Sequence, residues 1–160
     1  MEALPPELLA TILDREPVAR LALIADHGAP EVMPIVFARV GQALYSPIDG
    51  KPKAHGRLAR LRHIAREPRV GLVIDRYAAD WRALWWLRLA ATAREIDDLH
   101  PRFDDAVAAL LAKYPQYATT PLFSGTPTMI RFDIVELRWW GAAGLDGLRD
   151  GWMTEARHDA

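Results

Sequence analysis

The sequence contains no cysteine, and this absence narrows its chemistry before any pattern is considered. The chain can form no disulfide scaffold, thiol nucleophile or cysteine-ligated metal site, and a lack of disulfides is typical of cytoplasmic proteins. It also has no apolar run of about 18 residues, and its N-terminus lacks a basic segment followed by an apolar one. We therefore expect a cytoplasmic protein with no membrane span and no signal peptide.

Strong net charge is missing as well. With 20 basic and 21 acidic residues, the formal net charge is −1, which disfavours bulk attraction to nucleic acid or to an anionic membrane. The distribution is nevertheless uneven, since basic side chains dominate the stretch from Lys51 to Arg69 and Glu67 is its lone acid. A local basic surface on a neutral protein suits a small bound anion, and no nucleic-acid partner is expected.

Familiar catalytic motifs are absent too. The sequence has no glycine-rich phosphate loop between a strand and a helix, no His-Glu-x-x-His pair and no Gly-x-Ser-x-Gly elbow. Its histidines show no metal-ligand spacing, so no metal site is predicted. They are His27, His55, His63, His100 and His158.

Apolar periodicity predicts a mainly β protein with inserted helices. The predicted strands cover residues 18–25, 32–40, 43–45, 70–77, 84–96 and 126–140, and the predicted helices cover 4–15, 58–65 and 103–113. The first three strands follow one another through tight turns, which predicts a meander, and the whole set predicts an antiparallel barrel. At 160 residues one domain is expected, over residues 1–145, followed by a loop-like tail over residues 146–160.

The segment after the third strand is the strongest candidate site. Ser46, Lys51, Lys53 and Arg57 lie within a dozen residues, and together they could hold a phosphate through charge-assisted hydrogen bonds. A solvated basic face beside a proline-rich loop would have the same composition. Its place after a strand end favours binding, because binding groups often lie on loops held by a rigid sheet.

Paired tryptophans give a second signal. Trp85 and Trp86 are adjacent, as are Trp139 and Trp140, and adjacent residues of a strand point to opposite faces. One tryptophan of each pair must therefore cover a surface outside the core. A subunit interface or a planar ligand would satisfy it.

Several stretches together carry a family resemblance. They are residues 44–53 (Leu-Tyr-Ser-Pro-Ile-Asp-Gly-Lys-Pro-Lys), 58–64 (Leu-Ala-Arg-Leu-Arg-His-Ile), 68–70 with 75–77, and 80–81 with 84–86. In this order they resemble the pyridoxamine 5'-phosphate oxidase-like, FMN-binding split-barrel family, in its branch of coenzyme F420-dependent oxidoreductases. One departure is His63, where that branch has asparagine.

The resemblance implies a six-stranded antiparallel split β-barrel that forms a homodimer, with two cofactor sites at the subunit interface. The cofactor would be FMN or coenzyme F420. The implied contacts comprise a ring-binding strand (Met33, Pro34, Ile35 and Val36), a phosphate-binding group (Ser46, Lys51, Lys53 and Arg57) and an aromatic approach from the other subunit (Trp85 or Trp86).

The implied activity is hydride transfer between the cofactor ring and a small organic substrate. No catalytic side chain is assigned, and Tyr45 and Tyr77 are the candidates for an acid. Vitamin B6 oxidation is not expected, because Arg157-His158 does not reproduce the Arg-x-His pattern of the true oxidases. A non-enzymatic module that binds or stores flavin, deazaflavin or haem is the alternative, with His63 or His55 as an iron ligand.

Overall fold

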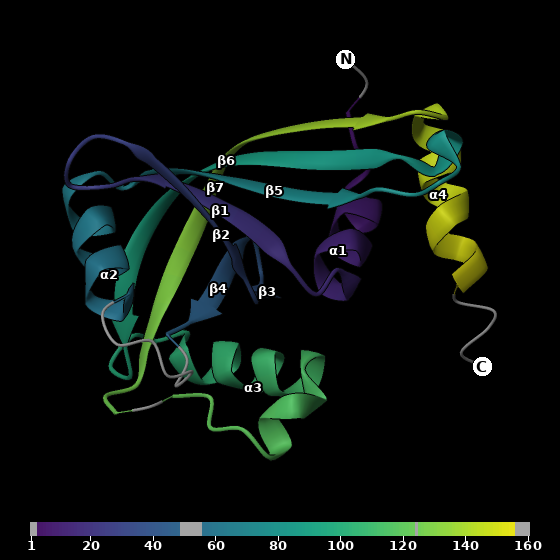
Figure 1. Ribbon diagram of the computed structural model, residues 1–160. Helices are drawn as coiled ribbons and strands as arrows, with labels where there is room; N and C mark the ends of the chain where they lie inside the picture. Colours follow the sequence, from purple (N-terminus) through teal and green to yellow (C-terminus); the bar gives the residue numbers. More distant parts are fainter. Residues whose placement is uncertain (1–2, 49–55, 124, 156–160) are drawn as a thin grey trace.

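The computed structural model describes residues 3–48, 56–123 and 125–155, and in this part of the chain a single antiparallel sheet dominates. Figure 1 shows it curving into a barrel with helices at its ends and below it. The strands are β1 (Ala19–Ile24), β2 (Pro30–Ile35), β3 (Ala38–Val40), β4 (Ala43–Pro47), β5 (Arg69–Arg76), β6 (Trp85–Asp97) and β7 (Thr128–Gly141). The α-helices are α1 (Pro6–Arg15), α2 (Gly56–Arg66), α3 (Phe103–Lys113) and α4 (Gly144–Glu155), with short 3₁₀ helices η1 (Trp81–Ala83) and η2 (Pro115–Ala118).

The strand order is β2-β1-β5-β6-β7-β4-β3, with every neighbouring pair antiparallel. The predicted mainly β, antiparallel architecture is therefore confirmed. The predicted meander is wrong, because the β1–β2 hairpin forms one edge of the sheet and the β3–β4 hairpin forms the other.

The predicted strand over residues 32–40 is two strands, divided at Val36 and Phe37. The Phe37 N–H donates to the Tyr114 hydroxyl (2.9 Å), which in turn lies 2.7 Å from the Phe37 carbonyl and 2.9 Å from that of Pro17. The hydroxyl has one proton, so it serves one of these carbonyls at a time. Because Tyr114 occupies the backbone groups of Phe37, strand pairing stops there and the chain changes from one edge of the sheet to the other.

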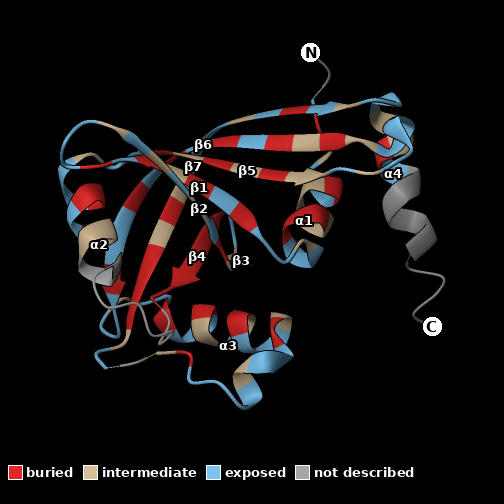
Figure 2. Cartoon of the chain, in the orientation of Figure 1, coloured by how far each residue is buried: buried red, intermediate tan, exposed pale blue. Residues whose placement is uncertain are grey.

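The two faces of the sheet have separate cores, visible as alternating burial in Figure 2. Inside the barrel lies the larger cluster, with Leu21, Leu72, Leu89 and Phe132 fully buried. The smaller cluster lies between the outer face and α3, and its members include Tyr45, Ile96, Phe103, Leu110 and Met129. The outer faces of β1, β2 and β5, strands that the structure describes in full, contribute no residue to this smaller cluster.

The end of the chain differs from the expectation of a loop-like tail. Residues Gly144–Glu155 form α4, and Leu148 belongs to the barrel core. The sequence suggested a loop because Gly144, Gly147 and Gly151 are poor helix formers, whereas packing of Leu145 and Leu148 on the barrel outweighs that preference. The boundary predicted between residues 145 and 146 falls inside this helix.

None of the helices in the described part of the chain is long and apolar enough to cross a lipid bilayer.

Candidate functional site

Strand β2, which carries three of the four predicted ring-binding residues, is an edge strand with two prolines four residues apart. Pro34 pairs with Arg20 and Pro30 pairs with Ile24. A proline has no N–H to give to a ladder, so the register directs the backbone groups of Met33 and Ile35 toward β1 and the Pro34 carbonyl outward. The Pro34 carbonyl is thus directed away from β1, at the open edge of the sheet, and Val36 follows just beyond the end of the strand.

A row of small or apolar residues crosses the outer face beside this edge. Ala22 pairs with Val32 on one side and with Gly71 on the other, and Gly71 pairs with Ala90. Val32 is 68% exposed, and none of the four side chains carries a polar group. We call Val32, Ala22, Gly71 and Ala90 the apolar row; it forms a flat, uncharged strip over four strands.

The predicted tryptophans lie at the start of β6. Trp85 is buried in the barrel core, and Trp86 is half-buried on the outer face, where it pairs with the 47% exposed Trp140. The Arg88 guanidinium lies 5.9 Å from the Trp86 ring centroid. The inference that adjacent tryptophans divide between two faces is confirmed, and Trp86 and Trp140 are the outward pair.

Trp86 is far from Ser46 of the same chain, one of the predicted phosphate-binding residues. Ser46 pairs with Ile130 of β7, which pairs with Glu95 of β6. Glu95 follows Trp86 by nine residues on the same strand, a separation of about 30 Å at roughly 3.3 Å per residue. One protomer therefore does not bring Trp86 and Ser46 to the same small molecule.

The phosphate-binding group is described only in part. Ser46 is 1% exposed and alternates with Leu44 and Ile48, both members of the inner core, so its side chain faces the barrel interior. Lys51 and Lys53 lie outside the described residues. Arg57 lies in the first turn of α2.

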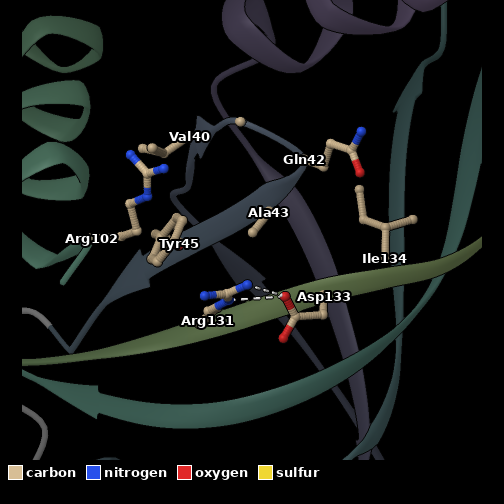
Figure 3. A pocket seen from close by; sticks show the side chains of 9 residues that line it. Val40, Gln42, Ala43, Tyr45, Arg102, Arg131, Asp133 and Ile134 are labelled. Carbon is tan, nitrogen blue, oxygen red and sulfur yellow. Dashed lines mark hydrogen bonds and ion pairs between the residues drawn. The ribbon is translucent and has the colours of Figure 1, made fainter. Parts of the chain in front are cut away.

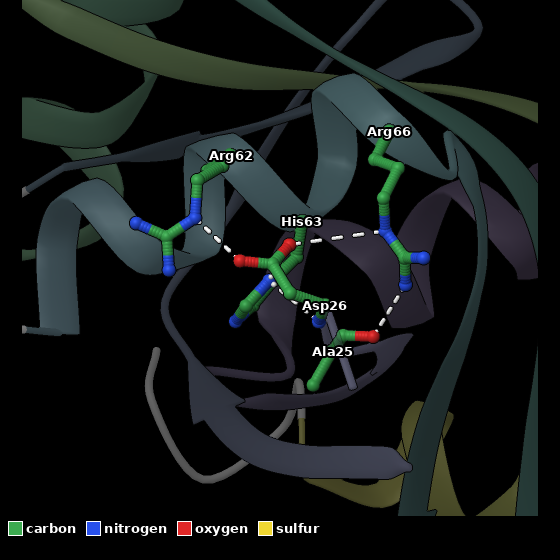
Figure 4. A network of polar contacts seen from close by, with 5 residues as sticks. All are labelled: Ala25, Asp26, Arg62, His63 and Arg66. Carbon is green, nitrogen blue, oxygen red and sulfur yellow. Dashed lines mark hydrogen bonds and ion pairs between the residues drawn. The ribbon is translucent and has the colours of Figure 1, made fainter. Parts of the chain in front are cut away.

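A polar network that the sequence did not reveal fixes α2 against the β1–β2 turn (Figure 4). His63 Nδ1 lies 2.9 Å from Asp26 Oδ1, and Arg62 Nε donates to Asp26 Oδ2 at 2.5 Å. Arg66 donates to the Ala25 carbonyl. The hydrogen bond from His63, followed by that from Arg62, lowers the pKa of Asp26. An aspartate in a turn gives no sequence signal for a partner 37 residues away.

A cavity of about 350 Å³ lies where the β3–β4 turn approaches β7 (Figure 3). It is lined by Arg131 and Asp133 of β7, by Tyr45 of β4, and by Arg102, which immediately precedes α3. Arg131 donates through Nε (2.9 Å) and Nη2 (2.6 Å) to Asp133 Oδ1. This cluster was not predicted from the sequence, although the alternate spacing of Arg131 and Asp133 on a strand places both on one face.

The other chemical candidates differ in accessibility. Tyr45 is 1% exposed and Tyr77 is 78% exposed. His63 is buried, and His55 lies outside the described residues. Among residues 3–48, 56–123 and 125–155, no three potential metal ligands cluster closely enough to hold an ion.

The chain matches the sequence model of one known protein family. The sequence profile of pyridoxamine 5'-phosphate oxidase matches residues 5–141. Among curated proteins, none matches the chain.

Solved structures of the same fold are similar over most of the chain, at identities that carry fold information alone. A haem-binding protein from Mycobacterium smegmatis is 18% identical (TM-score 0.66), over 89% of this chain and 57% of that protein, so the chain spans little more than half its length. An FAD-binding protein from Mesorhizobium loti is 19% identical (TM-score 0.62; 85% and 92% of the two chains). The haem storage protein HutZ from Vibrio cholerae is 16% identical (TM-score 0.65; 88% and 95%). With the family match, these similarities confirm the split-barrel fold.

Proposed function

The chain belongs to the pyridoxamine 5'-phosphate oxidase family, and on this premise we propose that it is an oxidoreductase that holds FMN or coenzyme F420 at a homodimer interface. It would transfer a hydride between the cofactor ring and a small organic substrate. The cytoplasmic location expected from the sequence is part of the same proposal. The observation that carries the proposal is that the open edge of β2 lies beside the apolar row. The strand edge could bind the polar edge of a planar ring, and the apolar row could contact its face.

A flavin or deazaflavin ring has polar atoms along its edge and an apolar face. The outward carbonyl of Pro34 and the backbone of Val36 offer hydrogen-bonding groups to such an edge. The apolar row offers contact without charge, and no large side chain rises from Ala22 or Gly71. These features fit the predicted ring contacts of Met33, Pro34, Ile35 and Val36. Met33 and Ile35 would contribute indirectly, because their pairing with β1 holds the strand edge in place beside the ring.

A second copy of the chain is part of the proposal for two reasons. The separation of about 30 Å between Trp86 and Ser46 along paired strands means that a cofactor held at Ser46 would meet Trp86 from another protomer. Trp85 is buried in the barrel core of its own chain, which leaves Trp86 as the tryptophan that could make this approach. The apolar row and the Trp86–Trp140 pair also form an exposed surface of the kind that subunits cover.

The phosphate-bearing tail would be held by Lys51, Lys53 and Arg57. Ammonium and guanidinium groups bind phosphate strongly when the geometry allows charge-assisted hydrogen bonds. The Asp26–His63 contact anchors the C-terminal half of the helix that carries Arg57. Ser46 has weaker support as a phosphate contact, because its hydroxyl faces the barrel interior.

When bound, the cofactor supplies the hydride chemistry. The chain would contribute the grip on the tail, the strand edge that orients the ring, and an apolar surface that excludes water from one face. These are binding and positioning roles, and they require no protein nucleophile.

Haem binding without turnover is the second candidate, because two of the similar structures are named for haem. His63 does not favour it, because its side chain is only 6% exposed. Its Nε2 could reach an iron only if the elements that cover the ring moved. His55 is the better test. A haem spectrum that changes on His55→Ala, with no flavin or deazaflavin bound, would support this alternative.

The interface is tested by Ala90→Glu. Ala90 is exposed in the apolar row, and in a two-fold interface each copy would bring its own glutamate to the contact. We expect the wild type to sediment at twice the 18.0 kDa of one chain and the variant to sediment as a monomer. Ala112→Glu, at an exposed position of α3, is the matched control and should remain dimeric. A monomeric wild type would contradict the proposed dimer.

The tail site is tested by the double variant Lys51→Ala, Lys53→Ala. Loss of two charge-assisted hydrogen bonds of about 1.5 kcal/mol or more each should weaken cofactor binding at least about a hundredfold. The fold should be almost unaffected, as is usual for charged surface groups. Arg82→Ala is the control, since Arg82 is exposed and pairs with the nearby Asp80 at 3.0 Å. Unchanged affinity in the double variant would show that the tail lies elsewhere.

A further inference from the structure

The cavity between α3, the β3–β4 turn and β7 has no role in the proposed cofactor site. It lies on the outer side of β4, which Tyr45 faces, whereas Ser46 faces the barrel interior. In Figure 3, Arg102 and Arg131 approach it from one side, and Gln42 and Ile134 lie on the other. Its volume of about 350 Å³ is that of a small-molecule site.

Positive charge exceeds negative charge around this cavity. Asp133 is the carboxylate in its wall, and it already receives Arg131 at 2.6 Å and Arg94 at 3.5 Å. Arg102 adds a second guanidinium to the wall. Its Nη1 donates to Asp105 at 3.0 Å. Burial, followed by the charges of Arg131 and Arg94, lowers the pKa of His100, which favours the neutral form of its ring.

Arg131 has hydrogen-bonding capacity to spare. A guanidinium has five N–H donors; two point to Asp133 Oδ1, and a third lies 3.4 Å from His100 Nε2. Two remain without a partner among the described residues. The side chain is 23% exposed and packs beside the Tyr45 ring, 5.9 Å from its centroid, so it is held in position before any ligand arrives.

An apolar hollow of about 370 Å³ adjoins the charged one. The two share Gly41, Gln42 and Ile134, and the second continues along α1 past Leu9 and Leu13. Arg39 fixes this wall, since it donates to both oxygens of Asp14 (2.9 and 2.6 Å) and to the Gly41 carbonyl (3.1 Å). These hydrogen bonds tie the β3–β4 turn to α1 and hold the wall of the apolar hollow in position.

We propose that this pair of hollows is a second binding site, which takes a small amphipathic organic anion. Its carboxylate or sulfonate would bind Arg131 and Arg102, and its apolar body would lie past Ile134 against Leu9 and Leu13. The site is independent of the proposed cofactor, because its walls contain none of the residues assigned to the ring or to the phosphate tail.

The test uses two dyes that differ by one sulfonate, anilinonaphthalene sulfonate and the uncharged N-phenyl-naphthylamine, each titrated against the full chain by fluorescence. Arg131→Gln should weaken sulfonate binding about tenfold and leave the uncharged dye unchanged, and Arg102→Gln should act in the same direction with a smaller effect. Arg82→Gln is the control, because Arg82 also pairs with a nearby aspartate at 3.0 Å.

Equal effects on both dyes, or no effect of either cavity variant, would overturn the proposal. If Arg131→Gln does not fold by circular dichroism, the more exposed Arg102 decides the question alone. Repeating the titration with saturating FMN and with coenzyme F420 separates the two sites. Unchanged dye binding supports a second site, and displacement of the dye by either cofactor overturns it. Failure of both cofactors to bind would contradict the proposed function and leave the dye result intact.

Discussion

Removal of a single hydroxyl, in Tyr114→Phe, should destabilise the barrel at the point where the chain changes edges. Tyr114 is 7% exposed and Phe37 is fully buried. The substitution preserves the ring and its contacts with α3 and η2. It removes the acceptor of the Phe37 N–H and the donor shared by the Phe37 and Pro17 carbonyls.

The magnitude follows from the donor that remains. A buried N–H left without a partner costs about 1–3 kcal/mol, so we expect the free energy of unfolding to fall by about 2 kcal/mol. For a chain of this size that corresponds to a decrease in Tm of roughly 4–8 °C. Urea and thermal unfolding followed by circular dichroism measure both quantities.

Tyr77→Phe is the matched control, because Tyr77 is 78% exposed and surface substitutions usually change stability by less than about 0.5 kcal/mol. If Tyr114→Phe and Tyr77→Phe unfold at the same urea concentration, the hydroxyl does not hold the junction between β2 and β3, and our explanation of the strand break is wrong.

Three further predictions concern pH, and the third of them tests the helix that carries Arg57. Burial lowers the pKa of Lys113 to about 8 from 10.5; between these values the unfolded chain holds the extra proton, so the stability of the wild type relative to Lys113→Met should rise with pH in urea titrations. Burial raises the pKa of Tyr114 to about 12 from 10.0; the folded chain then holds the extra proton, so stability relative to Tyr114→Phe should fall over that range. The pKa of Asp26 is lowered from its ordinary value of 3.8, so Asp26→Asn should destabilise the protein at neutral pH and lose this effect as pH falls below that ordinary value. A constant difference across pH in any of these pairs would contradict the assigned cause.

Elements with strong apolar periodicity were predictable from the sequence. The predicted helix over residues 103–113 coincides with α3, and strands β5, β6 and β7 lie close to their predicted positions. Helix α3 and strand β5 each bury one face in a single core, and β6 and β7 bury one face in the barrel core over most of their length. Periodicity reports such burial directly. The strand break at Phe37 was not predictable, because it depends on Tyr114, which is 77 residues away in the sequence.

The candidate site was predictable in the same uneven way. Alternation along a strand correctly divided Trp85 from Trp86 between two faces. The apolar row could not be read from the sequence, because Ala22, Gly71 and Ala90 become neighbours only through strand pairing. The burial of Ser46 was missed because every residue of β4 is buried, one side by the barrel core and the other by α3, and no alternation of polarity marks it.

The most direct test of the proposed function is the titration of the purified protein with FMN and with coenzyme F420, followed by absorbance and fluorescence, together with mass spectrometry of any molecule that co-purifies. We expect one of the two cofactors to bind at micromolar concentration with one molecule per protomer, and to accept or donate a hydride while bound. Binding of neither cofactor, with no flavin or deazaflavin co-purifying, would contradict the proposal.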